Sequence, residues 1–503
     1  MKKKQEQKNG FTGNQWMILI TLMLASFLGR LDGTIVNLAL PKIISDYGIT
    51  LSSAAWISTA YIIANAIFVP IFGKLGDMIG RKPLYIFGIV GFTLTSALAG
   101  LASNLPMMVF FRVLQAITVS IDYPLALSII AVAFTDKDQK TQAMGLWSAI
   151  FAAAAVFGPL LGGPLIDNFS WRSVFYINIP LGIIATYLSI KYIDEPVKHI
   201  KGIKNFDIAG SLLLGVFLGT LVLVLDQGQS WGWISTNSIS SYGIVLLSFF
   251  LFLFVEKNAK EPVVDLKFFS NMTFTSSIIN SFISFMGLIG GIFLIPVFCQ
   301  QFLGYSVTKA GYVFIPMAMG IMIASQVGAR LVMKYEARFV ISAGMAIASF
   351  GLWMFSGIDV KWTFFDIAIR LFVMAFGVGM GLAPLTRAAT STIPVHEIGI
   401  ASSILALARN IAGAFGTAIF ATILSNSITA NILTTQHYSV INNLDPSVVK
   451  EYLSLIAYKA NIQAFSTVFR TSVVIMMIGA CTSLFIKTGK LDKQSEHEEP
   501  IEI

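Results

Sequence analysis

The sequence predicts an all-α protein that crosses a membrane many times. Of its 503 residues, 55% are hydrophobic and 12% are charged, and the mean hydropathy is +0.76. Such a chain has too few polar residues to cover a soluble globule. A helix that crosses a bilayer needs about 20 apolar residues, and about fourteen such stretches use most of the chain. We therefore expect a multi-pass protein of the cell membrane, surrounded by the lipid bilayer, with no soluble domain.

The apolar stretches form two sets of six, separated by two additional spans. The predicted spans cover residues 16–38, 50–72, 83–102, 107–133, 142–165, 173–192, 207–226, 240–256, 273–302, 310–333, 339–357, 363–386, 398–425 and 466–487. The predicted domains are an N-terminal segment (1–15), a six-helix bundle (16–192), a linker with two extra transmembrane helices (193–272), a second six-helix bundle (273–487) with a long external loop (426–465), and a tail (488–503). We expect one or two short helices within the external loop. Weak similarity between the halves supports two related bundles.

The charged residues predict the orientation in the membrane. Most of the 34 Lys and Arg residues fall in segments on the side of the N-terminus, which is the cytoplasmic side by the positive-inside rule. An even number of spans places the C-terminus in the cytoplasm as well. Because the net charge of +8 is distributed over these loops, we expect no nucleic-acid partner.

The sequence lacks the motifs of several functional classes. No Gly-x-x-x-x-Gly-Lys-Ser/Thr loop occurs, so we expect no bound nucleotide. The two cysteines, Cys299 and Cys481, lie inside spans, and the spans contain no metal-ligand spacing and no pair of nucleophile and base. We therefore expect no metal site and no enzymatic activity.

The first span carries Arg30, Asp32 and Asn37 within an apolar run. A charge inside a bilayer costs several kcal/mol unless it faces a partner or a watery cavity. Arg112 of the fourth span lies about two turns from the outer end of its helix, at a depth similar to that of Asp32. We therefore expect these two side chains to pair, either for helix assembly or as part of a proton-coupled mechanism. Arg30 projects about 160° away from Asp32 and should meet another span or the substrate.

The segment 73–82 connects the second and third spans and combines glycines with one acid and several bases. Glycines permit a tight turn, and Asp77 and Arg81, four residues apart, can pair or cap helix ends. We expect a cytoplasmic loop at this position.

The fourth span continues past Arg112 to Gln115 and Asp122. Residues seven apart share one face of a helix, so Gln115 and Asp122 are expected to form one polar stripe. No cation on its own helix accompanies Asp122. Asp122 is therefore the stronger candidate for a carboxyl that gains and loses a proton.

The fifth span holds small residues at every fourth position, Ala154, Gly158 and Gly162, together with two prolines. Small residues allow a second helix to approach closely, and prolines bend a helix and free backbone groups. The sequence leaves two interpretations of this span open, close helix packing and conformational gating.

These features occur in the order 31–37, 73–82, 112–115, 158–163 and 171–180. In that order, the chain resembles the major facilitator superfamily, and more narrowly the fourteen-span drug:proton antiporters of the EmrB/QacA type. Later segments, 226–233, 265–269 and 409–416, also resemble the family, so that the resemblance covers nearly the whole chain.

The resemblance implies an exporter in which two bundles rock around a central cavity and exchange protons for a small amphipathic substrate. Proton coupling is expected from Asp32, Asp122 and Arg112. The substrate cavity is expected to include Arg30, Asn37, Gln115, Tyr123, Arg409 and Asn410. Conformational switching is expected of Gly73, Asp77, Gly80, Arg81, Gly158, Pro159, Gly162 and Gly163. We expect no cofactor, because a proton gradient supplies the free energy. Whether an accessory efflux protein takes part is left open.

The chain departs from the family pattern in ways that bear on its substrate. Asp122 stands where an apolar residue is usual, Arg30 is unusual at its position, and Ala154 replaces the first glycine of the antiporter motif. Intramembrane bases are at least as many as acids, whereas a cavity for dicationic drugs should carry surplus acid. Anionic, zwitterionic or neutral amphiphiles are therefore at least as plausible. The alternatives are an exporter of a physiological anionic or lipid-like substrate and a non-transporting membrane sensor.

Overall fold

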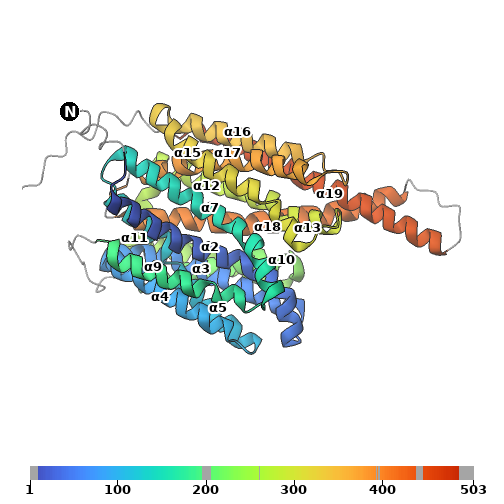
Figure 1. Ribbon diagram of the computed structural model, residues 1–503, viewed down its shortest axis with the longest axis horizontal. Coiled ribbons are helices and arrows are strands. Elements are labelled where there is room, and N and C mark those ends of the chain that lie inside the picture. The colour runs from blue at the N-terminus through green and yellow to red at the C-terminus, as the bar shows by residue number, and fades with distance from the viewer. Residues whose placement is uncertain are drawn as a thin grey trace, which may run out of the picture.

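The computed structural model describes residues 10–194, 206–259, 261–391, 393–394, 397–437 and 446–486. Throughout these ranges the regular structure is helical, and most helices run along the long axis of the molecule (Figure 1). Thirteen helical segments of the described residues are long and apolar enough to cross a membrane. The remaining predicted span, 142–165, lies within α7 (Lys137–Asn168). The all-α membrane architecture is thus confirmed, and the orientation of the termini stays a prediction.

The first half contains eight helical elements within the described residues. They are α2 (Gly13–Tyr47), α3 (Leu51–Ile79), α4 (Arg81–Gly100), α5 (Leu105–Val119), α6 (Asp122–Ala133), α7 (Lys137–Asn168), α8 (Ser173–Tyr176) and α9 (Asn178–Tyr192). The predicted fourth span is divided at Ser120 and Ile121 into α5 and α6. Asp122 consequently stands in the first turn of a helix rather than in the middle of one.

The two extra helices, α10 (Ile208–Trp231) and α11 (Thr236–Asn258), precede the second half. The second half consists of η2 (Leu266–Ser270), α12 (Met272–Phe293), α13 (Ile295–Gln301), α14 (Val307–Tyr312), α15 (Ile315–Lys334), α16 (Ala337–Phe355), α17 (Phe364–Thr390), α18 (Ile398–His437) and α19 (Pro446–Ser483). Helix α10 packs against both α3 and α18, so the extra pair lies beside the junction of the halves.

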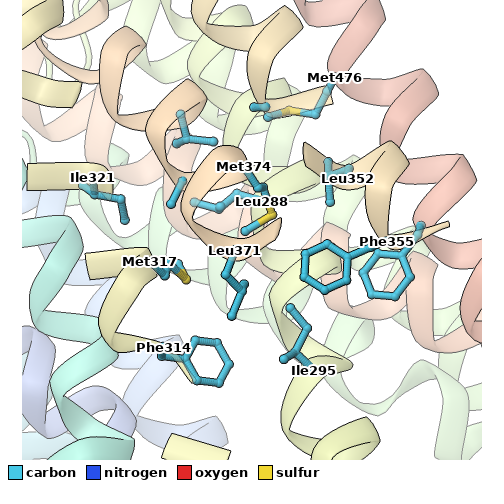
Figure 2. Packing of buried hydrophobic residues seen from close by; sticks show 14 of the residues in the cluster. Leu288, Ile295, Phe314, Met317, Ile321, Leu352, Phe355, Leu371, Met374 and Met476 are labelled. Atoms are coloured by element: carbon cyan, nitrogen blue, oxygen red, sulfur yellow. The ribbon is translucent and has the colours of Figure 1, made fainter. Parts of the chain in front are cut away.

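Each half has its own packed core, and the halves meet along defined helix pairs. Figure 2 shows the core of the second half, where Met317, Leu371, Met374 and Phe355 converge from α15, α16 and α17. Helix α7 packs on α15 and α17, while α3 and α6 pack on α18. These contacts place α3, α6 and α7 of the first half against α15, α17 and α18 of the second half at the junction.

The predicted external loop 426–465, expected to carry one or two short helices, consists largely of the ends of two longer helices. Helix α18 continues to His437, and α19 begins at Pro446, so that both extend beyond the bundle as a hairpin (Figure 1). Ile456 and Ala460 are buried, and the Asn431 side chain donates to the Ala460 carbonyl at 3.4 Å. Contacts between the two helices therefore stabilise the extension. The predicted tail 488–503 and residues 1–9 of the N-terminal segment lie outside the described residues.

The predicted loop 73–82 is also shorter than expected. Helix α3 continues to Ile79 and α4 begins at Arg81, which leaves Gly80 as the whole connection. Gly80 has φ 104°, a backbone conformation that L-residues with side chains rarely adopt. A Cβ at Gly73 would meet Ser403, and one at Gly76 would meet Leu125. The glycine spacing therefore serves one sharp turn and two close helix contacts.

Gly80→Ala should destabilise the protein by about 1–2 kcal/mol, because a Cβ is strained at this φ. The measurement is thermal unfolding in detergent micelles. Gly243→Ala in α11 is the matched control, since a Cβ there meets no atom within 4 Å. Equal melting temperatures for both variants would contradict the assigned backbone conformation.

Candidate functional site

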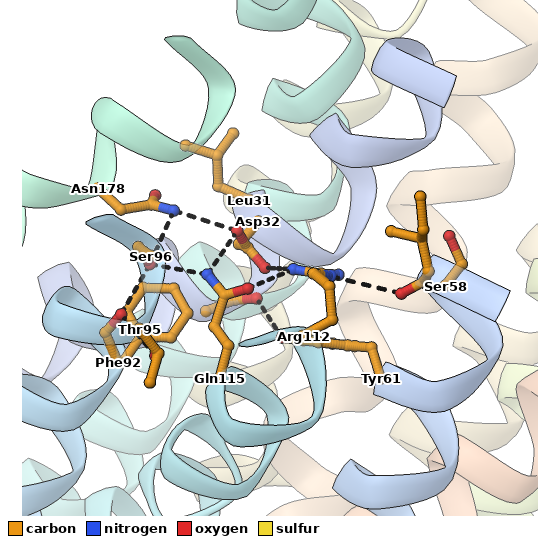
Figure 3. Close-up of polar contacts among 12 residues, drawn as sticks. Leu31, Asp32, Ser58, Tyr61, Phe92, Thr95, Ser96, Arg112, Gln115 and Asn178 are labelled. Atoms are coloured by element: carbon orange, nitrogen blue, oxygen red, sulfur yellow. Dashed lines mark hydrogen bonds and ion pairs between the residues drawn. The ribbon is translucent and has the colours of Figure 1, made fainter. Parts of the chain in front are cut away.

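A buried ion pair lies inside the first half (Figure 3). Arg112 Nη1 of α5 is 2.5 Å from Asp32 Oδ2 of α2, and the two residues are 1% and 0% exposed. The pairing that similar depth predicted is confirmed. Because neither charge meets solvent, the stabilisation of each depends on the other.

Two amides complete the environment of Asp32. The Gln115 side chain donates to Asp32 Oδ1 at 3.0 Å and to Ser96 Oγ at 2.7 Å, and the Asn178 side chain donates to Asp32 Oδ1 at 3.1 Å (Figure 3). These residues come from α4, α5 and α9. The carboxylate of Asp32 is therefore held by one cation and two neutral donors, which is a fully occupied arrangement.

Arg112 is enclosed on its other sides as well. Its guanidinium lies 4.0 Å from the centre of the Tyr61 ring, and its Nε donates to the Ile57 carbonyl at 3.4 Å. Cation–π contact and hydrogen bonds of this kind stabilise a desolvated guanidinium. The ion pair thus joins α2, α3 and α5 into one unit.

Asp122 lies in a different environment. It accepts a hydrogen bond from the Tyr85 hydroxyl at 2.9 Å, and the Ser26 hydroxyl interacts with the same carboxyl group. Tyr85 and Ser26 lie on α4 and α2, the helices that Gln115 also faces, so the predicted common face is confirmed despite the break at residues 120–121. A cavity of about 20 Å³ adjoins Asp122, which is enough for one water molecule.

Arg30 and Asn37 do not join the ion-pair network. The Arg30 guanidinium lies 4.1 Å from the centre of the Phe151 ring of α7. This confirms that Arg30 points away from Asp32 toward another span. Asn37 is exposed and accepts a hydrogen bond from Ser58 at 2.8 Å, nearer the end of the bundle.

Arg409 of α18 connects the two halves at their centre. It donates to the Tyr123 hydroxyl of α6 at 2.7 Å and to Ser281 Oγ of α12 at 2.8 Å. The neighbouring Asn410 donates to the Asn65 side chain of α3 at 3.0 Å. Tyr123 and Arg409, both predicted for the substrate cavity, are thus in direct contact across the interface.

Asp77, the acid of the segment 73–82, joins the two halves at one end of the molecule. Asp77 accepts a hydrogen bond from the Ile400 backbone N–H at the start of α18 at 3.1 Å, and it pairs with Arg81 at 3.4 Å. A carboxylate at a helix N-terminus is favoured by the helix dipole. At the same end the Ser325 hydroxyl donates to the Gly145 carbonyl at 2.7 Å. This end, predicted to be cytoplasmic, is therefore closed.

The glycines of the fifth span make close helix contacts. A Cβ at Gly158 would collide with Thr34 and one at Gly162 with Leu38, while one at Gly163 would make a tight contact with Thr308 of α14. Helix α7 continues through Pro159, whose side chain lies outside the described residues. The packing interpretation of this motif is supported by these contacts.

Comparisons with known proteins agree with this architecture. A family model described as the Major Facilitator Superfamily matches residues 22–417. The chain belongs to the Major Facilitator Superfamily. The multidrug transporter protein MdtP of Bacillus subtilis (strain 168) is 31% identical, with 98% of this chain and 96% of the relative covered. The multidrug export protein EmrB of Escherichia coli (strain K12) is 30% identical, with 84% of this chain and 82% of the relative covered.

A further relative and two solved structures extend the comparison. The riboflavin transporter RibZ of Clostridioides difficile (strain 630) is 30% identical, with 83% of this chain and 90% of the relative covered. The human organic anion transporter MFSD10 has a TM-score of 0.63 at 12% identity, covering 92% of this chain and 99% of that one. A bacterial homologue of the lysosomal transporter Spinster has a TM-score of 0.57 at 16% identity, covering 95% and 98%. The two structures support the fold alone.

Several residues of this major facilitator protein were not predicted for the site. Ser96 and Asn178 contact the ion-pair network, Tyr85 contacts Asp122, and Phe151 stacks on Arg30. Ser96 and Asn178 are isolated polar residues within apolar spans, and this signal would have been sufficient to consider them.

Arg112→Met should destabilise this major facilitator protein by about 3–5 kcal/mol, because it leaves the Asp32 carboxylate buried without its cation. Thermal unfolding in micelles measures the loss. The double variant Asp32→Asn/Arg112→Met should recover much of it, since the uncompensated charge is gone. Arg338→Met is the control and should cost less than about 1 kcal/mol, because the side chains of Arg338 and its partner Glu336 are 36% and 31% exposed. A double variant no more stable than Arg112→Met would contradict this assignment.

Proposed function

We propose that this protein is a multidrug exporter that exchanges protons for small amphipathic substrates by alternating access. Relatives named multidrug transporter and multidrug export proteins, which match most of the chain, support the export of drugs. The observation that carries the proton step is the position of Asp122. It is bonded to hydroxyl groups rather than to a cation, and it directly precedes Tyr123, which contacts the opposite half.

The two buried acids have different roles in this proposal. Asp32 is structural, because Arg112 and two amides occupy its oxygens. Asp122 carries the proton, because hydroxyl partners can hydrogen-bond to either form of a carboxyl group. The proton gradient supplies the free energy, and no cofactor takes part.

Alternating access requires that the closed end opens. The bonds that close it are the Asp77 contact with Ile400, the Ser325 contact with Gly145, and the ion pair of Lys74 with Glu261 at 2.7 Å. Each joins parts of the chain that are far apart in sequence and must break when the substrate enters from that side. Protonation of Asp122 changes the charge near Arg30 and beside Tyr123, which contacts Arg409, and this couples the proton to the centre of the interface.

A second candidate is an exporter of a physiological anionic or lipid-like substrate on the same fold. The observation that favours it is the presence of Arg30 and Arg409 near the centre of the interface, where neither forms an ion pair with a carboxylate in the described part of the chain. A relative with a different named cargo, the riboflavin transporter RibZ, is as similar to this chain as EmrB.

Asp122→Asn should reduce proton-driven transport to background while the protein stays folded, because an amide keeps the shape of the side chain and cannot exchange a proton. The assay is ethidium transport into inverted proteoliposomes under an imposed pH gradient, together with proton release followed by a pH-sensitive dye. Asp366→Asn is the control, since Asp366 is a helix-capping acid at the surface. Unchanged gradient-driven transport in Asp122→Asn would remove Asp122 from the mechanism.

A further inference from the structure

Two arginines from opposite halves approach one aromatic cluster. Arg30 of α2 lies 4.1 Å from the centre of the Phe151 ring, and the Phe151 and Tyr123 rings meet edge to face with centroids 4.9 Å apart. Arg409 of α18 donates to the Tyr123 hydroxyl at 2.7 Å. Two aromatic rings therefore separate a cation of the first half from a cation of the second half.

Neither guanidinium forms an ion pair with a carboxylate within the described part of the chain. The hydrogen bonds of Arg409 go to the hydroxyls of Tyr123, Ser281 and Thr386, and Arg30 makes none with the described residues. Asp32 pairs with Arg112, while Asp122 is hydrogen-bonded to Tyr85 and attracts Arg30 only through space. The two positive charges repel each other, at a location where solvation by water is poor.

The surroundings of the two charges are aromatic. Trp147 stacks on Phe151 with centroids 5.1 Å apart, and Arg409 lies 4.9 Å from the centre of the Phe285 ring of α12. Arg30 is half-buried, so that part of this residue remains accessible. Paired guanidiniums bind carboxylate, sulfonate or phosphate groups, and aromatic rings bind flat apolar bodies.

We propose that Arg30 and Arg409 form an anion subsite that takes an aromatic organic anion, with the acidic group at the accessible Arg30 guanidinium, the ring system against Phe151 and Tyr123, and the charge of Arg409 adding to the attraction. The transport of this anion rests on the proposed exporter function, whereas its binding does not. An anion bound here relieves the repulsion between the halves and favours their closure around it. Its release restores the repulsion and favours reopening.

The probes are fluorescein and rhodamine 123, which share a xanthene ring system and differ in charge. Fluorescence anisotropy with the purified full-length chain in micelles should show tighter binding of anionic fluorescein than of cationic rhodamine 123. Arg30→Gln should weaken fluorescein binding by about tenfold or more, the effect of one lost charge-assisted hydrogen bond. Arg30→Lys should retain part of the affinity, because the positive charge remains. Rhodamine 123 binding should not weaken in either variant.

Arg172→Gln is the matched control and should leave both affinities unchanged. Arg172 also lies over an aromatic ring, 4.2 Å from the centre of Trp171, but at an exposed position where it pairs with Asp46. Thermal unfolding of all variants shows whether a loss of binding reflects a loss of folding. If Arg30→Gln does not fold, Arg30→Lys and Arg409→Lys provide the comparison, and each should weaken fluorescein more than rhodamine 123.

Tighter binding of rhodamine 123 than of fluorescein, or equal fluorescein affinity in folded Arg30→Gln and the unchanged protein, would overturn the anion subsite. Transport in proteoliposomes separates this result from a failure of the exporter function. If rhodamine 123 is moved by the gradient but fluorescein binding does not depend on Arg30, the exporter function is supported and the anion subsite is rejected. Arg30-dependent fluorescein binding without gradient-driven movement of either dye supports the subsite and counts against the exporter.

Discussion

The buried ion pair between Asp32 and Arg112 is the interaction on which the first half of the protein depends. Either charge alone would be costly in a region without water, so the pair fixes α2 against α5 at one depth. Gln115 and Asn178 extend the same network to α4 and α9. Once these helices are fixed, the position of Arg30 follows, because it lies on α2 at a defined angular and axial separation from Asp32. Asp122 lies on the next helix, α6, where its hydrogen bond with Tyr85 of α4 holds it beside the same helices.

This arrangement divides the intramembrane charges into two groups. Asp32 and Arg112 neutralise each other inside one half and have no bonded contact with the other half among the described residues. Asp122, Arg30 and Arg409 lie nearer the interface and are bonded to neutral groups or stacked on rings. The first group stabilises the bundle. The second group consists of charges without an ion-pair partner, and such charges are required to couple protons, substrate and conformation.

Sequence reasoning predicted what depends on depth and periodicity. The spans follow from hydropathy, the partner of Asp32 from matching depth, and the direction of Arg30 from helical geometry. It failed where the outcome depends on contacts between distant segments. Gly73 faces Ser403 of the other half, and Ala460 packs beside Asn431 where two long helices replace the short helices expected in an external loop. A single polar residue such as Ser96 carries no sign of which helix it will face.

The central claim is that Asp122, and not Asp32, exchanges the proton. Infrared difference spectroscopy of the purified protein measures this directly, by recording the carboxyl C=O band that appears or disappears when substrate binds. The account predicts that this band is present in the unchanged protein and in Asp32→Asn, and absent in Asp122→Asn. A band that persists in Asp122→Asn and vanishes in a folded Asp32→Asn variant would contradict it.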